Sequence, residues 1–93
     1  MHVYAAIFEL DLPSRSLKGK RGIVKSILAR SRHQFNISAA EVGMADTPDR
    51  ALLGFATVSG SRLVARQQME QLEEWIVGDR PDVEIISVDI EER

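Results

Sequence analysis

Residues 3–12 read VYAAIFELDL, and this stretch decides the fold because it predicts a strand in the interior of a sheet. Successive side chains of a strand point to opposite faces, and every second residue from Tyr4 to Leu12 is apolar. The other face begins with Val3, Ala5 and Ile7 and turns acidic only afterwards. Because both faces are apolar for most of the length, we expect a central strand.

Hydrophobic periodicity predicts five further elements. They are helices at about 17–34 and 61–77 and strands at about 37–44, 51–59 and 83–91. Pro13 ends the first strand, and Ser14 or Ser16 can cap the first helix. Turn residues from Asp46 to Asp49 predict a hairpin between the second and third strands. Gly78 is expected to stop the second helix.

The order of these elements is β-α-β-β-α-β. This order contains two β-α-β units, and the crossover within each unit is right-handed. Two such units side by side form a four-stranded antiparallel sheet with both helices on one face. We therefore predict an α+β fold of the ferredoxin-like type, in a single domain over residues 1–93. Trp75 shares a helical face with Val64, Leu72 and Ile76, which predicts that these side chains belong to the core.

The composition restricts the chemistry open to the chain. The apolar fraction of 44% and the charged fraction of 28% are typical of a folded globular protein. There is no Cys, which excludes disulfides, thiol chemistry and Cys-based metal sites and favours a reducing, cytoplasmic setting. No stretch approaches the roughly 20 apolar residues of a membrane span. The start reaches Glu9 without a basic segment or a long apolar run, so we expect no signal peptide.

No catalytic or metal-binding pattern is present. The two histidines, His2 and His33, have no partner at the spacing that metal binding or activation of a nucleophile requires. Gly19 and Gly22 lie within the predicted first helix and lack the preceding strand and the Lys-Ser/Thr pair of a phosphate loop. We therefore expect no enzyme activity, no cofactor and no metal.

Charge is distributed unevenly around the net value of −2. Between Leu12 and Ala40 there is no acid but there are seven Lys or Arg residues, whereas from Glu70 onward nine acids stand against two Arg residues. This asymmetry is consistent with an anionic partner for the first half. An alternative interpretation is that the two halves attract each other.

Four cations of the predicted first helix form the sharpest pattern in the chain. Lys18, Arg21, Lys25 and Arg32 are spaced 3, 4 and 7 residues apart. At about 100° per residue, all four lie within roughly 60° of arc. A row of cations along a helix suits the phosphates of a nucleic-acid backbone, so these residues are our candidate RNA contacts. The alternative is a solvated face whose charges meet the acidic second half.

The face of the sheet opposite the helices is a second candidate site. The run from Leu53 to Val58 is similar to an RNA-recognition motif but lacks its basic residue and two of its aromatic residues, so base stacking is not expected. Ile7 and Phe55 are instead our candidate interface residues, because surplus apolar area on a sheet marks a contact surface. This pattern predicts a homodimer. The alternative function is thus a protein-interaction or small-ligand module without nucleic acid.

Three runs of residues resemble the YlxP-like bacterial family: Ser16-Leu17-Lys18-x-Lys20-Arg21, then Val24-Lys25-x-Ile27-Leu28-x-Arg30, then Phe35-Asn36-Ile37-Ser38 with Glu41. The likeness continues through Arg50-Ala51, the third strand and the second helix. It implies a ferredoxin-like fold and no assigned enzymatic activity. Members are often encoded beside initiation factor 2 and ribosome-binding factor A, which implies a role near ribosome assembly or translation. Ribosomal RNA or a ribosomal subunit is therefore our candidate partner.

The sequence departs from that family in two places. Gly19 and Gly22 stand where an acid and a bulkier or charged residue are usual, which flattens one face of the helix. The hairpin segment Ala45–Arg50 keeps an Asp and an Arg but lacks the usual Gln and Trp. A function that depends on that aromatic loop is therefore not expected here.

Overall fold

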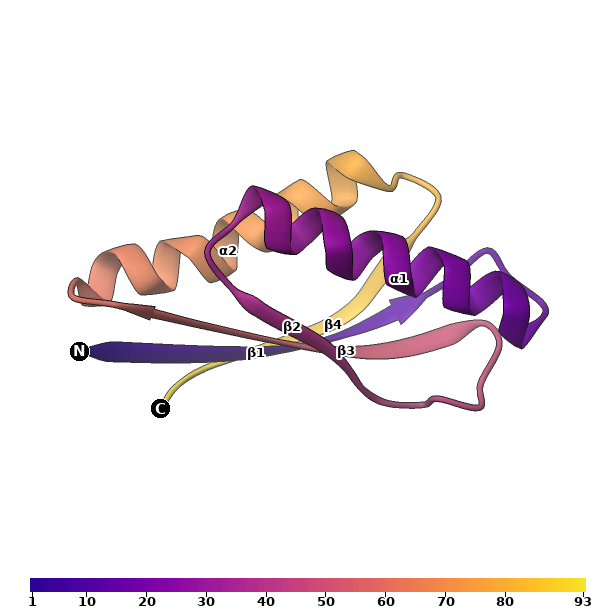
Figure 1. Cartoon of the computed structure of the whole chain (residues 1–93), viewed down its shortest axis with the longest axis horizontal. Helices are drawn as coiled ribbons and strands as arrows, with labels where there is room; N and C mark the ends of the chain where they lie inside the picture. Colours follow the sequence, from indigo (N-terminus) through magenta and orange to yellow (C-terminus); the bar gives the residue numbers. More distant parts are fainter.

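A computed structural model describes all residues 1–93 of the chain. The elements are β1 (His2–Asp11), α1 (Leu17–Gln34), β2 (Ser38–Gly43), β3 (Arg50–Ser59), α2 (Arg62–Asp79) and β4 (Glu84–Glu92). The strands form one antiparallel sheet in the order β2-β3-β1-β4, and both helices cover the same face (Figure 1). This arrangement confirms the predicted ferredoxin-like α+β fold, with β1 in the interior of the sheet.

Both helices begin at a capping serine. The hydroxyl of Ser16 accepts a hydrogen bond from the Gly19 N–H at 3.0 Å, and the hydroxyl of Ser61 accepts one from the Val64 N–H at 3.3 Å. Each bond satisfies a backbone donor that has no partner inside the helix. The predicted stop at Gly78 is wrong, because α2 runs through that residue to Asp79 before the chain reaches Pro81.

The core lies between the sheet and the two helices. The inward side chains of β1 and β3 are almost entirely buried, and the rings of Phe8 and Phe55 meet with centroids 5.1 Å apart. The prediction that Phe55 lies on the open sheet face is therefore wrong, since this side chain is only 3% exposed and points toward the helices. Ile7 does lie on the open face, where it is 40% exposed.

A β-bulge changes the faces of β4. The register against β1 shifts between Glu9, which faces Ser87, and Leu10, which faces Ile85. Ile86 is the extra residue and is exposed, so Ile85 and Val88 both point toward the core. Strict alternation along the strand predicted at 83–91 would place these two residues on opposite faces, and the inserted residue prevents this.

Trp75 and Val64 lie farther from the core than their helical spacing predicts. The Trp75 ring is half-buried at the rim, where it meets Phe35 edge to face with centroids 5.8 Å apart. Val64 is 46% exposed and does not belong to the core at all. The buried residues of α2 instead follow a narrower stripe of Ala65, Met69, Leu72 and Ile76.

Phe55 and Val58 offer a matched pair of substitutions on opposite faces of β3. We expect Phe55→Ala to lower the free energy of unfolding by about 3–5 kcal/mol, because it removes a buried ring and leaves a cavity. Val58→Ala, on the open face, should cost about 0.5 kcal/mol or less, as surface substitutions usually do. Urea unfolding followed by circular dichroism measures both. Equal losses for the two variants would contradict the assignment of faces.

Candidate functional site

The basic stripe consists of Lys18, Arg21, Lys25 and Arg32 on α1. All four side chains are exposed, and none of the ion pairs in the structure includes any of them. The stripe lies on the side of α1 that faces the edge strand β2, because the Arg32 Nη2 donates to the Ala39 carbonyl at 2.9 Å. This bond occupies only one of the five donors of the guanidinium group.

A groove of about 380 Å³ runs along the stripe. Three stripe residues line it, and Val24, Leu28 and Ala29 supply apolar walls. Glu41 of β2 is the single acid in the lining. Its carboxylate lies 3.1 Å from the ammonium group of Lys20, which offsets its charge. The groove is therefore predominantly cationic.

Lys20 is a structural residue that the sequence analysis missed. Its side chain is only 2% exposed, and the ammonium group donates to the Met44 carbonyl as well as to Glu41. Met44 has a φ of 57°, in the left-handed region, at the end of the β2 strand. The spacing did contain a signal, because Lys20 precedes Val24 by four residues and so lies on the buried side of the helix.

Arg30 lies on the opposite side of α1 and contacts α2. Its Nε and Nη2 donate to the two carboxylate oxygens of Asp79 at 2.9 and 2.5 Å. These hydrogen bonds hold the pKa of Asp79 below its ordinary value, and the charge of Arg30 acts in the same direction. Arg30 is therefore a link between the two helices and does not belong to the basic stripe.

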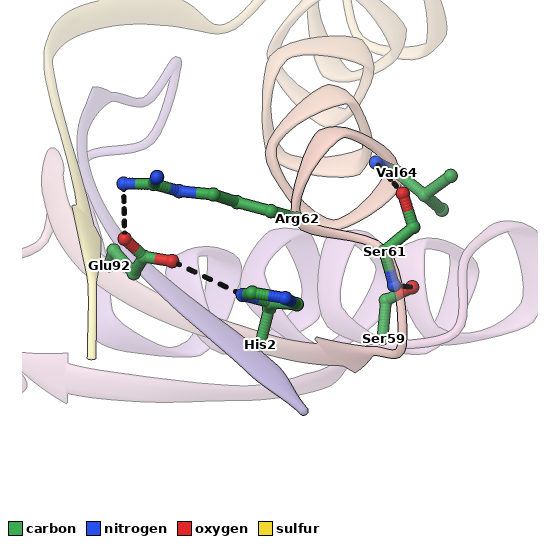
Figure 2. A network of polar contacts seen from close by, with 6 residues as sticks. All are labelled: His2, Ser59, Ser61, Arg62, Val64 and Glu92. Atoms are coloured by element: carbon green, nitrogen blue, oxygen red, sulfur yellow. Dashed lines mark hydrogen bonds and ion pairs between the residues drawn. The ribbon is translucent and has the colours of Figure 1, made fainter.

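Several acids of the second half pair with cations that lie outside the stripe. Figure 2 shows Glu92 of β4 between Arg62 of α2 and His2 of β1, at 2.7 and 3.6 Å. On α2, Arg66 contacts Glu70 at 3.1 Å. No acid of α2 or β4 forms an ion pair with the stripe. The attraction between the basic first half and the acidic second half of the chain therefore involves Arg30 and not the stripe.

The open sheet face is apolar at its centre and acidic at one margin. A hollow of about 330 Å³ is lined mostly by small residues, together with Ile7, Val42 and Phe55, and Arg93 lies at its border. Gly54 allows this packing, since a Cβ atom there would approach the Val42 Cγ1 to 2.8 Å. Asp89 and Glu91 pair with Ile7 and Ala5 in the β1–β4 register and so lie on this same face.

The remaining sequence features do not assemble into a site. No group of three or more His, Cys, Asp or Glu side chains could hold a metal ion. His33 is exposed on α1 and lines a shallow groove with Trp75, Ala29 and Arg30. No helix is both long enough and apolar enough to span a membrane.

The fold and its basic helix define a small ferredoxin-like domain with a cationic groove and an apolar sheet face. Residues 3–90 match the family described as "Protein of unknown function (DUF503)", and the chain belongs to this family. The chain is 40% identical over 57 residues to "Uncharacterized protein YlxP" of Bacillus subtilis (strain 168). That match covers 61% of this chain and 62% of the relative, so it spans about three-fifths of the relative's length. The family resemblance inferred from the sequence is thereby confirmed.

The Arg30–Asp79 pair predicts a specific pH dependence of stability. Because the pKa of Asp79 is lowered in the folded protein, its contribution is present above about pH 4 and is lost as the pH falls through the folded-state pKa. We expect Arg30→Gln to lower the melting temperature near neutral pH and the difference from the unmodified protein to shrink below about pH 4. Arg15→Gln is the control, since Arg15 has no ion pair. A difference that stays constant down to about pH 2 would contradict the assignment.

Proposed function

We propose that this chain is a non-catalytic, cytoplasmic RNA-binding protein that associates with the ribosome through the basic stripe. The observation that carries the proposal is a row of exposed cations on one helix, none of which has an acid partner. Ordinary surface cations of helices gain stabilisation from acids three or four residues away, and α1 contains no acid at all. The ribosome as the site of action rests on the family resemblance.

Phosphates would relieve the charge that the fold leaves uncompensated. From Lys18 to Arg32 the stripe extends about 21 Å along the helix axis, at about 1.5 Å per residue. Cations that neutralise phosphates release condensed counterions, which supplies most of the affinity of sequence-independent binding. The net charge of the whole chain is −2, so the attraction has to be local to this face. Binding should therefore be weak, salt-dependent and tolerant of sequence.

The salt dependence gives a quantitative test. If all four cations contact phosphates, log K should fall against log salt with a slope of roughly −3, from about −0.7 to −0.9 per contact. The double variant Lys18→Glu/Lys25→Glu should roughly halve this slope, because two of the four contacts are lost. Fluorescence anisotropy with labelled ribosomal RNA fragments, starting near 50 mM salt, measures the slope.

A matched control separates the stripe from total charge. Arg66 and Arg93 are exposed and lie outside the stripe, so Arg66→Glu/Arg93→Glu changes the net charge by the same amount. This control should leave the slope unchanged. Circular dichroism of both double variants checks that the fold is intact. If the unmodified protein shows no salt-sensitive association with ribosomal RNA or subunits, or if both double variants weaken binding equally, the proposal is wrong.

The open sheet face favours a second proposal, a homodimer. A two-fold interface requires one surface that complements itself, and the sheet face around Ile7 and Val42 is largely apolar and uncovered. With the two-fold axis parallel to the strands, β4 of one copy lies over β2 of the other. This arrangement keeps the carboxylates of Asp89 and Glu91 away from those of the second copy.

Ile7→Glu tests the dimer without disturbing the core. The side chain is on the open face, so we expect the variant to fold and to be monomeric, because a buried unpaired carboxylate at the interface is costly. Val77→Glu is the control, since Val77 is exposed on α2, on the helix side of the sheet. Light scattering at micromolar concentration gives the mass of each protein. A monomeric unmodified chain would exclude the dimer.

A further inference from the structure

We infer that the basic stripe takes base-paired RNA, through its phosphate backbone, in preference to single strands. This inference rests on the proposed function and adds the class of RNA. Proteins that bind single-stranded RNA combine cations with exposed aromatic rings on which unpaired bases stack. Duplex RNA is instead recognised through its shape, its phosphates and its 2′-hydroxyl groups. The position of every aromatic ring in this chain can therefore discriminate between the two.

None of the five Phe, Tyr and Trp residues can serve as a stacking platform beside the stripe. The exposed imidazole ring of His33 lines the groove of Arg30 and Trp75, and it does not line the groove of the stripe. Tyr4, Phe8 and Phe55 are buried beneath the helices. Phe35 and Trp75 pack against each other, edge to face, at the rim of the core. Trp75 adjoins Arg30, which places it on the α2 side of α1 and away from the stripe.

The open sheet face cannot act as a base-stacking platform either. In RNA-recognition domains of this fold, the central strands present aromatic rings to the bases. Here the corresponding surface of β1 and β3 carries aliphatic side chains, among them Ile7, Leu52 and Val58. The carboxylates of Asp89 and Glu91 border the same surface and would repel phosphates.

The helix that carries the stripe is fixed at both ends, which suits a ligand whose phosphates are already ordered. Lys20 fixes the first turn of α1 to β2, and the Arg30–Asp79 pair fixes the last turns to α2. Arg32 is itself held by the Ala39 carbonyl. A flexible single strand would lose conformational entropy when it orders along this row, whereas a duplex is already ordered.

The surface beside the stripe also permits close approach. Gly22 and Ala29 lie next to the stripe on the outer side of α1 and are exposed, and a Cβ atom at Gly22 would meet nothing within 4 Å. Long side chains at these positions would hold a rigid duplex away from the helix backbone. With these small residues, a duplex can approach the helix backbone closely beside the four cations.

The test compares one RNA in two forms. A labelled RNA strand is titrated alone and as a duplex of about 16 base pairs, a length that covers two successive minor grooves. At about 50 mM salt we expect the duplex to bind at least about tenfold more tightly than the strand. A second duplex of unrelated sequence should bind equally well. Tighter binding of the single strand, or strong discrimination between the two duplexes, would overturn this inference while leaving the proposed function in place. If neither form binds, the proposed function itself fails.

A variant at Gly22 gives an independent readout. Gly22→Gln should keep or raise the stability, because Gln has a higher helix propensity than Gly and the position is open. We expect it to weaken binding of the duplex several-fold and to leave the weak binding of the single strand unchanged. The charges of the stripe are not altered by this substitution, so a parallel loss for both forms would contradict close approach of a duplex.

Discussion

The buried ammonium group of Lys20 sets the orientation of α1 on the sheet. It is enclosed between the helix and the end of β2, where Glu41 and the Met44 carbonyl are its partners. A buried charge without a partner is costly, so a rotation of the helix about its axis would carry a large penalty. The direction in which Lys18, Arg21, Lys25 and Arg32 point therefore depends on a residue that is itself buried. Stability and the candidate function share this contact.

The sequence predicted the architecture because its periodic signals were strong, and it failed where they were ambiguous. The alternation in β1 and the serine cap of α1 have a direct physical meaning, and the structure agrees with them. In β3 both sets of alternate residues are apolar, so alternation alone could not tell that Phe55 faces the helices. In β4 the bulge at Ile86 inserts one residue, and a shift of one residue reverses every later face.

In the candidate site, too, local spacing along the chain could be predicted from the sequence, whereas contacts between distant residues could not. The spacing of the stripe follows from helix geometry, and the structure keeps its four residues on one exposed side of α1. The pairing of Arg30 with Asp79, and of Arg62 with Glu92, joins residues far apart in the chain and cannot be derived from spacing. Lys20 was overlooked because Lys usually lies in water, although its helical position was that of a core residue.

The strand order has a consequence for how the chain folds. The hairpin of β2 and β3 and both helices are local structures, which form within microseconds in isolated peptides. The central strand, by contrast, joins distant parts of the chain, since Tyr4 faces Thr57 on one side and Glu92 on the other. Closing such long loops costs conformational entropy before the new contacts compensate for it. Domains rich in contacts between distant residues therefore fold more slowly. During synthesis on a ribosome, the sheet therefore remains incomplete until β4 has left the exit tunnel, and β1 has neither of its neighbours until β3 emerges.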